Sequence, residues 1–283
     1  MDVTAPKAFV IGYPIGHSRS PLIHGHWLET LGLAGSYERI EVRPEELRGF
    51  IRGFGQRGFV GGNVTIPHKE AVFELIDEAT EVARRLGAVN TLWIEPDGRV
   101  IGHNTDSAGF AGGLAEAIGS DWSKDVETAL VLGAGGAARA VVAGLLDSGV
   151  SRIIVANRSP ERATPLYAFA PDRIEAIPIG DVEGRLGHAD LFVNATSLGM
   201  KGQPELAISL ESLPERAIVS DIVYVPLETP LLAAARRRGL RTADGLGMLL
   251  HQAVPGFRTW FGATPQVTPE LRALIEADVQ RGG

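Results

Sequence analysis

Residues 128–138 read Thr-Ala-Leu-Val-Leu-Gly-Ala-Gly-Gly-Ala-Ala, an apolar run followed by a glycine-rich turn and a segment of small residues. The apolar run predicts a buried strand, and the segment after the turn predicts a helix. In the pattern G-x-G-x-x-A, the first glycine makes the tight turn, the second lets a pyrophosphate approach the backbone, and the helix start offers free N–H groups. A turn without a ligand is the alternative interpretation of so short a motif. We predict a dinucleotide site at Gly133, Ala134, Gly135, Gly136 and Ala137.

The end of the next expected strand indicates which dinucleotide is bound. Sites for NAD place an acidic residue about 20 residues after the glycines, where it binds the ribose hydroxyls. Here that strand ends in Val155-Ala156-Asn157-Arg158-Ser159, and Arg162 follows shortly afterwards. Two guanidinium groups, with no carboxylate at the strand end, suit a 2′-phosphate; solvated surface arginines are the alternative. We therefore predict that NADP(H) binds at Asn157, Arg158, Ser159 and Arg162.

Strands and helices alternate on both sides of this turn. The expected strands are Thr128–Gly133, Arg152–Ala156, Asp190–Asn194 and Ala217–Val223, and the expected helices are Ser107–Ile118, Ala137–Ser148 and Leu231–Arg238. Repeated strand–helix units at this spacing are typical of a parallel sheet with helices on both faces. This half of the chain therefore predicts a Rossmann-like, doubly wound α/β fold.

The first third of the chain also alternates strands and helices. Strands are expected at Lys7–Gly12, Tyr37–Val42 and Gly58–Thr65, and Pro96-Asp97-Gly98 predicts a β-hairpin between Thr91–Glu95 and Arg99–His103. Ser20 is expected to cap a helix over Pro21–Leu33. The last part, Leu246–Phe261 and Pro269–Gln280, is expected to be helical. We predict an α/β substrate domain from residues 1–104 and 243–283, with a cofactor domain from residues 105–242 inserted into it.

The composition excludes several classes of protein. The chain has 283 residues, a net charge of −7 and no cysteine, which argues against binding to nucleic acid or to an anionic membrane and excludes disulfides and thiolate chemistry. Its histidines form no H-E-x-x-H motif, so no metal site is expected. The apolar run in Met1–Val10 is too short for a signal peptide, and the longest apolar stretch, Ala129–Leu146, contains Arg139 and several glycines. We expect a cytoplasmic protein.

Polar residues gather at four points in the first third of the chain. Ser18 and Ser20 stand where a helix begins, and hydroxyls beside free N–H groups suit a small anion such as a carboxylate. The other three clusters follow expected strands and are Asn63-Val64-Thr65-Ile66-Pro67-His68-Lys69, Ala88-Val89-Asn90-Thr91 and Asn104-Thr105-Asp106. A helix cap is the alternative for the serines, and a solvated surface side chain is the alternative for Lys69. Four such clusters together favour a site for a small polar ligand.

With these blocks in view, the chain resembles the shikimate dehydrogenase family over nearly its whole length. In the first third the resemblance rests on Pro14 with His17-Ser18-x-Ser20-Pro21, Asn63-Val64-Thr65-x-Pro67-x-Lys69, Ala88-Val89-Asn90-Thr91 and Asn104-Thr105-Asp106-x-x-Gly109. Later blocks are Gly133–Arg139, Asn157-Arg158, Asn194-Ala195-Thr196-Ser197-Leu198-Gly199-Met200, Asp221-x-x-Tyr224-x-Pro226-x-x-Thr229-Pro230, Gly245-Leu246-Gly247-Met248-Leu249 and Gln252. One position departs from the family, because Gly25 follows His24 where asparagine is usual.

The resemblance implies the NADPH-dependent reduction of 3-dehydroshikimate to shikimate. By the same resemblance, Ser18 and Ser20 hold the substrate carboxylate, and Lys69 and Asp106 form the catalytic pair. Residues implied to bind the substrate hydroxyls or to line the pocket are Asn63, Thr65, Asn90, Asp106, Tyr224 and Gln252. Further residues implied to contact the cofactor are Thr196, Gly245 and Met248. The expected partner is a small-molecule substrate alone.

Two alternative functions stay open. One is a quinate or quinate/shikimate dehydrogenase that uses NAD(P): quinate carries an extra ring hydroxyl, and Ser20 in place of a threonine-like group favours shikimate only modestly. The other is a non-catalytic protein that senses dinucleotides, although the presence of both Lys69 and Asp106 argues against it. The sequence leaves the oligomeric state open, with a homodimer among the options.

Overall fold

The computed structural model describes residues 5–282 and divides the chain into two compact units. The first unit contains residues up to Thr105 together with Gln252–Ile275, and the second contains Asp106–His251 together with the residues from Glu276 onward. Residues 1–4 and 283 lie outside the described residues, and with them the start of the Met1–Val10 segment. The second boundary falls at His251, beyond residue 242, because helix α9 (Gly245–His251) packs on helix α5 (Asp106–Ile118) within the second unit.

The first unit is built on a six-stranded mixed sheet with strand order β2-β1-β3-β5-β6-β4. Its strands are β1 (Lys7–Gly12), β2 (Ser36–Glu41), β3 (Phe59–Val64), β4 (Glu78–Ala79), β5 (Thr91–Ile94) and β6 (Val100–His103). Strands β1, β2 and β3 are parallel, whereas β5 pairs antiparallel with both β3 and β6. The predicted hairpin between β5 and β6 is therefore confirmed.

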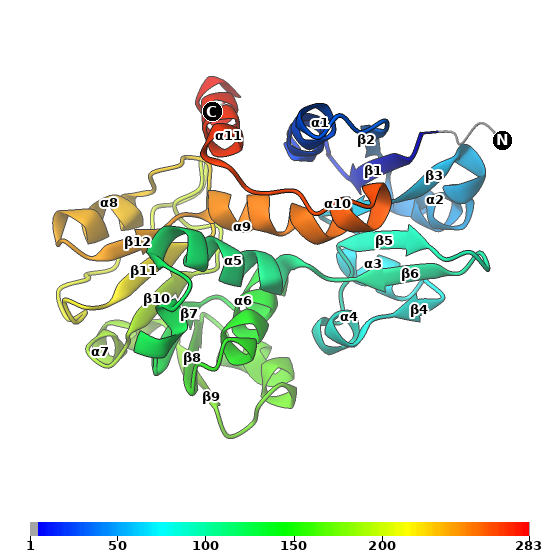
Figure 1. The fold of residues 1–283 in the computed structure, drawn as a ribbon. Helices are drawn as coiled ribbons and strands as arrows, with labels where there is room; N and C mark the ends of the chain where they lie inside the picture. Colours follow the sequence, from blue (N-terminus) through cyan, green and yellow to red (C-terminus); the bar gives the residue numbers. More distant parts are fainter. Residues whose placement is uncertain (1–4, 283) are drawn as a thin grey trace. The chain divides into compact units, whose positions relative to one another are not determined.

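Helices cover both faces of this sheet. They are α1 (Ser20–Thr30), η1 (Pro44–Glu46), α2 (Leu47–Gly53), η2 (Gly55–Arg57), α3 (Lys69–Phe73), α4 (Glu81–Leu86), α10 (Ala253–Phe261) and the first part of α11 (Pro269–Gly282). Helix α10 runs along the sheet (Figure 1), where the indole Nε1 of Trp260 donates to the carbonyl oxygen of Leu92 at 2.8 Å. Gly61 makes room for that indole, since an added Cβ would lie 2.4 Å from its nitrogen.

One sequence prediction near α1 is wrong in detail, and one near the carboxyl end is confirmed with a break. Ser20 is the first residue of α1 and does not cap it; Arg19 is the N-cap residue, and the Ser18 hydroxyl accepts from the Ser20 N–H at 3.4 Å. The region Leu246–Phe261 is helical as expected, and it consists of two helices, α9 in the second unit and α10 in the first, separated at Gln252. Pro255 explains the break, because it has no N–H to donate to the carbonyl of the residue four positions earlier.

The second unit is a six-stranded parallel sheet with order β12-β11-β10-β7-β8-β9. Its strands are β7 (Thr128–Leu132), β8 (Arg152–Asn157), β9 (Ile174–Pro178), β10 (Leu191–Asn194), β11 (Ile218–Asp221) and β12 (Arg241–Ala243). Numbered within the unit, this is the 3-2-1-4-5-6 order of a dinucleotide-binding fold, in which ligands bind at the carboxyl ends of the central strands. The predicted doubly wound fold is confirmed. The edge strands β9 and β12 were not expected from the sequence.

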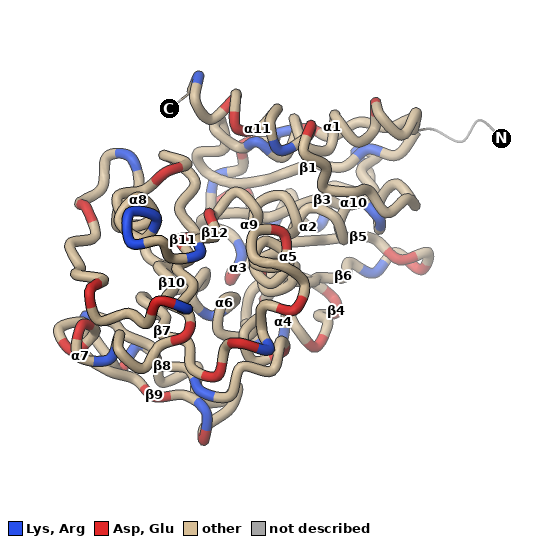
Figure 2. The backbone as a smooth tube through the Cα atoms, turned by 60° about the vertical axis from the view of Figure 1, so that its left-hand side comes forward, with Lys and Arg blue, Asp and Glu red and all other residues tan. Residues whose placement is uncertain are grey.

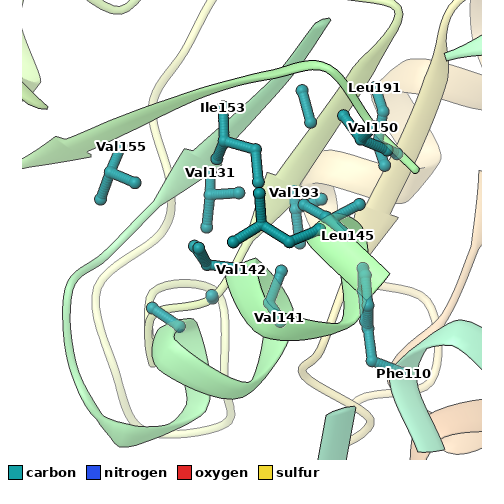
Figure 3. Close-up of a cluster of buried hydrophobic side chains, with 14 of the residues drawn as sticks. Phe110, Val131, Val141, Val142, Leu145, Val150, Ile153, Val155, Leu191 and Val193 are labelled. Carbon is teal, nitrogen blue, oxygen red and sulfur yellow. The ribbon is translucent and has the colours of Figure 1, made fainter. Parts of the chain in front are cut away.

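Helices flank this second sheet and enclose its core. They are α5, η3 (Trp122–Asp125), α6 (Gly136–Asp147), η4 (Pro160–Ala168), η5 (Ile179–Asp181), α7 (Glu183–Leu186), α8 (Pro230–Arg237) and α9. Figure 3 shows Val142 and Leu145 of α6 among Val131 of β7 and Ile153 of β8, all of them fully buried. A strand buried on both faces reads as a continuous apolar run, which explains why residues 128–132 stand out in the sequence.

Acidic and basic residues are interspersed along both units, and α8 ends in a run of arginines (Figure 2). No helix within residues 5–282 is both long and apolar enough to cross a membrane.

Candidate active site

The first part of the candidate site lies at the start of α1. The Ser18 N–H donates to the Ile15 carbonyl at 3.0 Å, and Ser20 is only 6% exposed. A guanidinium nitrogen of Arg39, on β2, donates to the carbonyl oxygen of Ser18 at 2.5 Å. Two hydroxyls, the start of a helix and a cation thus lie together, and each of these favours an anion. Sequence reasoning missed Arg39, because a charged residue on an alternating strand is normally a solvated one.

The second part lies at the carboxyl ends of β1 and β3. Asn63 is 5% exposed, and its Nδ2 donates to the carbonyl oxygen of Asn90 at 3.0 Å. The half-buried Thr65 donates its N–H to the Ile11 carbonyl at 2.9 Å. Gly12 permits this approach, because an added Cβ would lie 2.7 Å from the Thr65 methyl group.

Asn90 is the centre of a buried polar network in the first unit. Its Oδ1 accepts from the hydroxyl of Thr91 at 2.8 Å and from the N–H of Thr105 at 2.9 Å. Its Nδ2 lies 3.5 Å from Oε1 of Gln252, which enters the unit from a distant part of the sequence. The structure therefore joins three of the predicted substrate-binding residues, Asn63, Asn90 and Gln252, through hydrogen bonds. Thr91 and Thr105 belong to the same network and were quoted in the motifs without an assigned role.

The two predicted catalytic residues belong to different units. Lys69 is the first residue of α3 in the first unit; it is half-buried, and its carbonyl accepts from the Val89 N–H at 2.9 Å. The preceding His68 is buried, and its Nε2 lies 2.7 Å from the carbonyl oxygen of Val42. Since a carbonyl only accepts, Nε2 carries the proton. Asp106 opens α5 in the second unit and is 8% exposed, a position where the helix dipole favours a carboxylate. Their action as a catalytic pair stays a prediction.

The glycine-rich turn between β7 and α6 has the expected geometry. Gly133 has φ +110°, and an added Cβ would lie 3.0 Å from the carbonyl oxygen of Ala195, so no other residue fits without strain. Gly135 is the N-cap of α6, which begins at Gly136. An added Cβ at either of these two glycines would meet nothing within 4 Å. The space above the helix start is therefore open to a ligand.

A pocket of about 500 Å³ lies over this turn. Its lining residues are Ala134, Gly135, Gly136, Arg139, Glu161, Arg162, Thr164 and Pro165. Two guanidinium groups and the amino end of a twelve-residue helix form a chemically suitable setting for the phosphates of a dinucleotide. These residues therefore fit the cofactor that the sequence predicts.

The predicted cofactor residues differ in their relation to this pocket. Arg162 lines it, whereas Arg158 is exposed and is not among the lining residues. Asn157 donates from Nδ2 to the carbonyl oxygen of Ser159 at 2.9 Å and so shapes the turn after β8. Arg139 also lines the pocket, but the sequence analysis did not assign it to the cofactor site. Its position in the first turn of the helix after the glycine motif could have indicated this role.

A second buried polar network shapes the loops after β10 and β11. The hydroxyl of Thr196 donates to Oδ1 of Asn194 at 2.7 Å, and Nδ2 of Asn194 donates to Asp221 at 2.9 Å. Asp221 also accepts from the hydroxyl of Thr229 at 2.7 Å, while burial raises the pKa of its carboxyl group. Half-buried Tyr224 follows on the second of these loops. Motif residues outside the predicted site therefore hold the loops that carry Thr196 and Tyr224.

Packing explains the glycines of the block that contains Gly245 and Met248. A Cβ on Gly245 would lie 2.1 Å from the carbonyl oxygen of Ile222. A Cβ on Gly247 would lie 2.9 Å from the Cα of Gly113, where α9 meets α5. Met248 is half-buried against the core of the second unit. Contact of Gly245 and Met248 with the cofactor stays a prediction.

The departure at Gly25 has no packing consequence in the structure. Gly25 is exposed on α1, and an added Cβ would meet nothing within 4 Å. The neighbouring His24 is completely buried.

Comparisons with known proteins cover the whole chain. The family model described as the shikimate dehydrogenase substrate binding domain matches residues 10–92, shikimate / quinate 5-dehydrogenase matches residues 113–226, and the shikimate 5'-dehydrogenase C-terminal domain matches residues 245–274. A protein of Methylobacterium radiotolerans named shikimate dehydrogenase (NADP(+)) is 59% identical over 280 residues, which is 99% of each chain.

Solved structures agree with these matches. The Thermus thermophilus shikimate 5-dehydrogenase in complex with NADP(H) and shikimate is 37% identical, with a TM-score of 0.83, over 98% of this chain and 100% of that one. The Corynebacterium glutamicum quinate dehydrogenase in complex with NAD is 34% identical, with a TM-score of 0.88, over 96% and 99%. The family models and the 59% identical relative show that the chain belongs to the shikimate dehydrogenase family.

Proposed function

We propose that this protein is an NADP-dependent shikimate dehydrogenase, which reduces 3-dehydroshikimate to shikimate with NADPH and catalyses the reverse reaction. The observation that carries the proposal is the 59% identity to a shikimate dehydrogenase (NADP(+)) over 99% of both chains. The polar network around Asn90 and the pocket over the glycine-rich turn support it, because each offers the groups that one of the two ligands needs.

The substrate carboxylate is assigned to the start of α1. Ser18 and Ser20 donate their hydroxyl protons to it, and the guanidinium of Arg39 on β2, which donates to the Ser18 carbonyl, adds positive charge there. Hydrogen bonds to a charged group contribute about 1.5–3 kcal/mol each. The ring hydroxyls are assigned to the amide-rich sheet end, where Asn63, Thr65, Asn90 and Gln252 offer both donors and acceptors.

The proton transfer is assigned to Lys69. Reduction of a ketone forms one C–H bond and one O–H bond, and bound NADPH supplies the hydride for the first of these. Lys69 as an ammonium group donates the proton to the ketone oxygen, and as an amine it accepts the proton back in the reverse direction. Asp106 is assigned as the second member of the catalytic pair. Tyr224 is assigned to the substrate pocket.

The preference for NADP(H) is assigned to the pocket over the glycine-rich turn. Arg139 and Arg162 place two permanently charged groups there, and a 2′-phosphate accepts from a guanidinium in bidentate fashion. Glu161 also lines the pocket, so the two arginines outweigh one carboxylate. The remaining predicted contacts are part of the same proposal: Asn157, Arg158, Ser159, Thr196, Gly245 and Met248.

The quinate-type alternative has a specific observation in its favour, the likeness to a quinate dehydrogenase with a TM-score of 0.88. One experiment separates the functions: NADPH oxidation is followed with 3-dehydroshikimate and with 3-dehydroquinate, and both assays are repeated with NADH. We expect the highest kcat/KM for 3-dehydroshikimate with NADPH. Faster turnover of 3-dehydroquinate with NADH supports the quinate-type enzyme, and binding of NADPH without turnover of either ketone supports the sensing protein.

We further propose a cytoplasmic location, because the reduction draws on NADPH from the intracellular pool. We also propose a homodimer as the oligomeric state. Cell fractionation and sedimentation of the purified protein check these two points.

A further inference from the structure

Tyr37 is a buried phenol in the first unit that the proposed mechanism does not use. It lies on β2 and is 9% exposed. Its ring stacks on the imidazole of His24, with ring centroids 4.0 Å apart and an interplanar angle of 7°. The indole of Trp260 lies on another side, with centroids 5.9 Å apart. Two aromatic neighbours in sequence-distant elements thus fix where the hydroxyl of Tyr37 points.

That hydroxyl contacts a predicted substrate-binding residue. The Tyr37 hydroxyl oxygen lies 2.6 Å from Oδ1 of Asn63, and both residues are buried. The direction of the hydrogen bond follows from the other end of the amide. Nδ2 of Asn63 faces the carbonyl oxygen of Asn90, which can only accept, so Oδ1 must face Tyr37 and the phenol must donate.

The same amide connects Tyr37 to the rest of the substrate network. Nδ2 of Asn63 also lies 3.3 Å from the hydroxyl of Thr91, and that hydroxyl donates to Oδ1 of Asn90 at 2.8 Å. Tyr37 therefore stands at the start of a continuous chain of hydrogen bonds that ends at Asn90. Removal of the Tyr37 hydroxyl leaves the buried Oδ1 of Asn63 without its hydrogen-bond donor. A buried unpaired oxygen is costly, so the Asn63 side chain is expected to rearrange.

The donor keeps its proton under all working conditions. Burial raises the pKa of Tyr37 well above 10.0, although the Ser20 hydroxyl and Asn63 act in the opposite direction. His24 does not compete for the phenol proton: among the described residues neither ring nitrogen of His24 has a hydrogen-bond partner of normal geometry.

We propose that Tyr37 is a positioning residue of the substrate site, which acts by fixing the amide orientation of Asn63 and, through it, the donors and acceptors of Asn90. This inference rests on the proposed function, because it takes the Asn63–Asn90 network as the part of the site that binds the ring hydroxyls. It adds to that function a residue that never touches the substrate and yet sets the affinity for it.

The test replaces Tyr37 by phenylalanine, which keeps the stacked ring and removes only the hydroxyl. We expect the KM for 3-dehydroshikimate at saturating NADPH to rise about tenfold, the effect of losing one buried hydrogen bond. The KM for NADPH is expected to stay within about twofold, and kcat within about threefold. Tyr167→Phe is the matched control, because it also removes a phenol hydroxyl that makes a hydrogen bond, here by accepting from the Ala176 N–H in the second unit.

A double-mutant cycle tests the route of the effect. If Tyr37 acts through Asn63, the KM of the double variant Tyr37→Phe/Asn63→Ala equals that of Asn63→Ala alone within about twofold. A double variant whose KM is the product of the two single effects overturns the inference. So does a Tyr37→Phe enzyme that melts earlier but has an unchanged KM, since that is the result of a purely structural role.

Failure of the proposed function has a different signature. It appears in the unmodified protein as the absence of 3-dehydroshikimate turnover, before any variant is made. If Tyr37→Phe does not fold, Asn63→Ala decides the matter: an unchanged KM for 3-dehydroshikimate overturns the inference, and a raised KM with an unchanged KM for NADPH supports the role of the network.

Discussion

The two units present their polar groups in opposite ways. In the first unit, the proposed substrate site consists of side chains: Asn63, Asn90 and Gln252 are amides held by one another at the end of a mixed sheet. In the second unit, the proposed cofactor site starts from the backbone, because Gly133 and Gly135 leave the amino end of α6 open, and arginine side chains line the pocket beside it. The backbone part tolerates any sequence that keeps the turn, whereas the side-chain network fails when a single amide is lost. Substitutions in the first unit should therefore act on the substrate, and those in the second on the cofactor.

The largest effect is expected for Lys69→Ala. Loss of the proton donor should lower kcat by about 10²–10⁴-fold, the usual range for a general acid–base group, while both KM values change much less. Lys124→Ala is the control, because Lys124 is exposed and paired with Asp121. Initial rates at saturating substrates measure the effect. A variant with nearly normal kcat would show that Lys69 is a surface residue.

The serines at the start of α1 should come next. Ser18→Ala and Ser20→Ala are each expected to weaken substrate binding by about 1.5–3 kcal/mol, since each removes a hydrogen bond to a carboxylate. Affinities for 3-dehydroshikimate and for an analogue without the carboxylate are compared by titration. The loss should vanish for the analogue. Equal losses for both compounds would mean that the serines only shape the helix start, as the contact between Ser18 and the Ser20 N–H allows.

On the cofactor side, Arg162→Ala should reduce kcat/KM for NADPH by about 10–100-fold with little effect on NADH, the loss of one charge-assisted contact. Arg158→Ala is expected to act in the same direction but less, because Arg158 does not line the pocket. Arg152→Ala is the control, since Arg152 pairs with Glu175 at the start of β8. Equal losses with both cofactors, or a wild-type enzyme that uses NADH as well as NADPH, would remove these arginines from the 2′-phosphate site.

The smallest effect concerns stability of the first unit against acid. Burial lowers the pKa of His24 to about 3 from 6.5, although the neighbouring Asn63 opposes this. The unfolded chain therefore binds a proton at this histidine that the folded chain rejects, so stability falls as the pH drops from about 7 toward 3. Between pH 7 and pH 5.5 the loss from this residue is about 1 kcal/mol.

His24→Leu should remove that part of the pH dependence, and His26→Leu, half-buried on the same helix, should not. Unfolding is followed by tryptophan fluorescence in a Trp122→Phe background, because the remaining tryptophans, Trp27, Trp93 and Trp260, all lie in the first unit. An unchanged acid sensitivity in His24→Leu would contradict the assignment.

The sequence predicted the central strands of the second unit better than its edge strands. A strand buried on both faces, such as residues 128–132, is a continuous apolar run and is easily seen. Strand β9 was missed because it is a sheet edge that contains Glu175 and ends in Pro178, and three-residue β12 is too short for any periodicity. The break between α9 and α10 arises because Pro255 has no N–H to donate to the carbonyl four residues earlier. The pattern of apolar residues alone does not indicate such a break.

For the site, the motifs located the residues but not their connections. The resemblance assigned the substrate role to Asn63, Asn90 and Gln252. The hydrogen bonds between them, however, depend on long-range contacts such as the pairing of β3 with β5, which the motifs do not contain. Tyr37 was missed because an aromatic residue on an alternating strand is normally a core residue. The sequence does not indicate which group its hydroxyl contacts. Arg39 and Arg139 were missed for another reason: a lone arginine is usually solvated.

The late position of α10 in the chain has a consequence for synthesis on the ribosome. Trp260 caps the sheet of the first unit by donating to Leu92 and by filling the space over Gly61, and the Trp27 indole donates to the carbonyl of Gln266 at 3.0 Å. A nascent chain that has just passed Thr105 therefore holds every strand of the first sheet but not α10, which covers part of it. The inserted unit emerges with its six strands before Trp260 is made, so the sheet that is made first is covered completely only after the second sheet has been made. Fusion or truncation at the carboxyl end should accordingly disturb the amino-terminal sheet before it disturbs the middle of the chain.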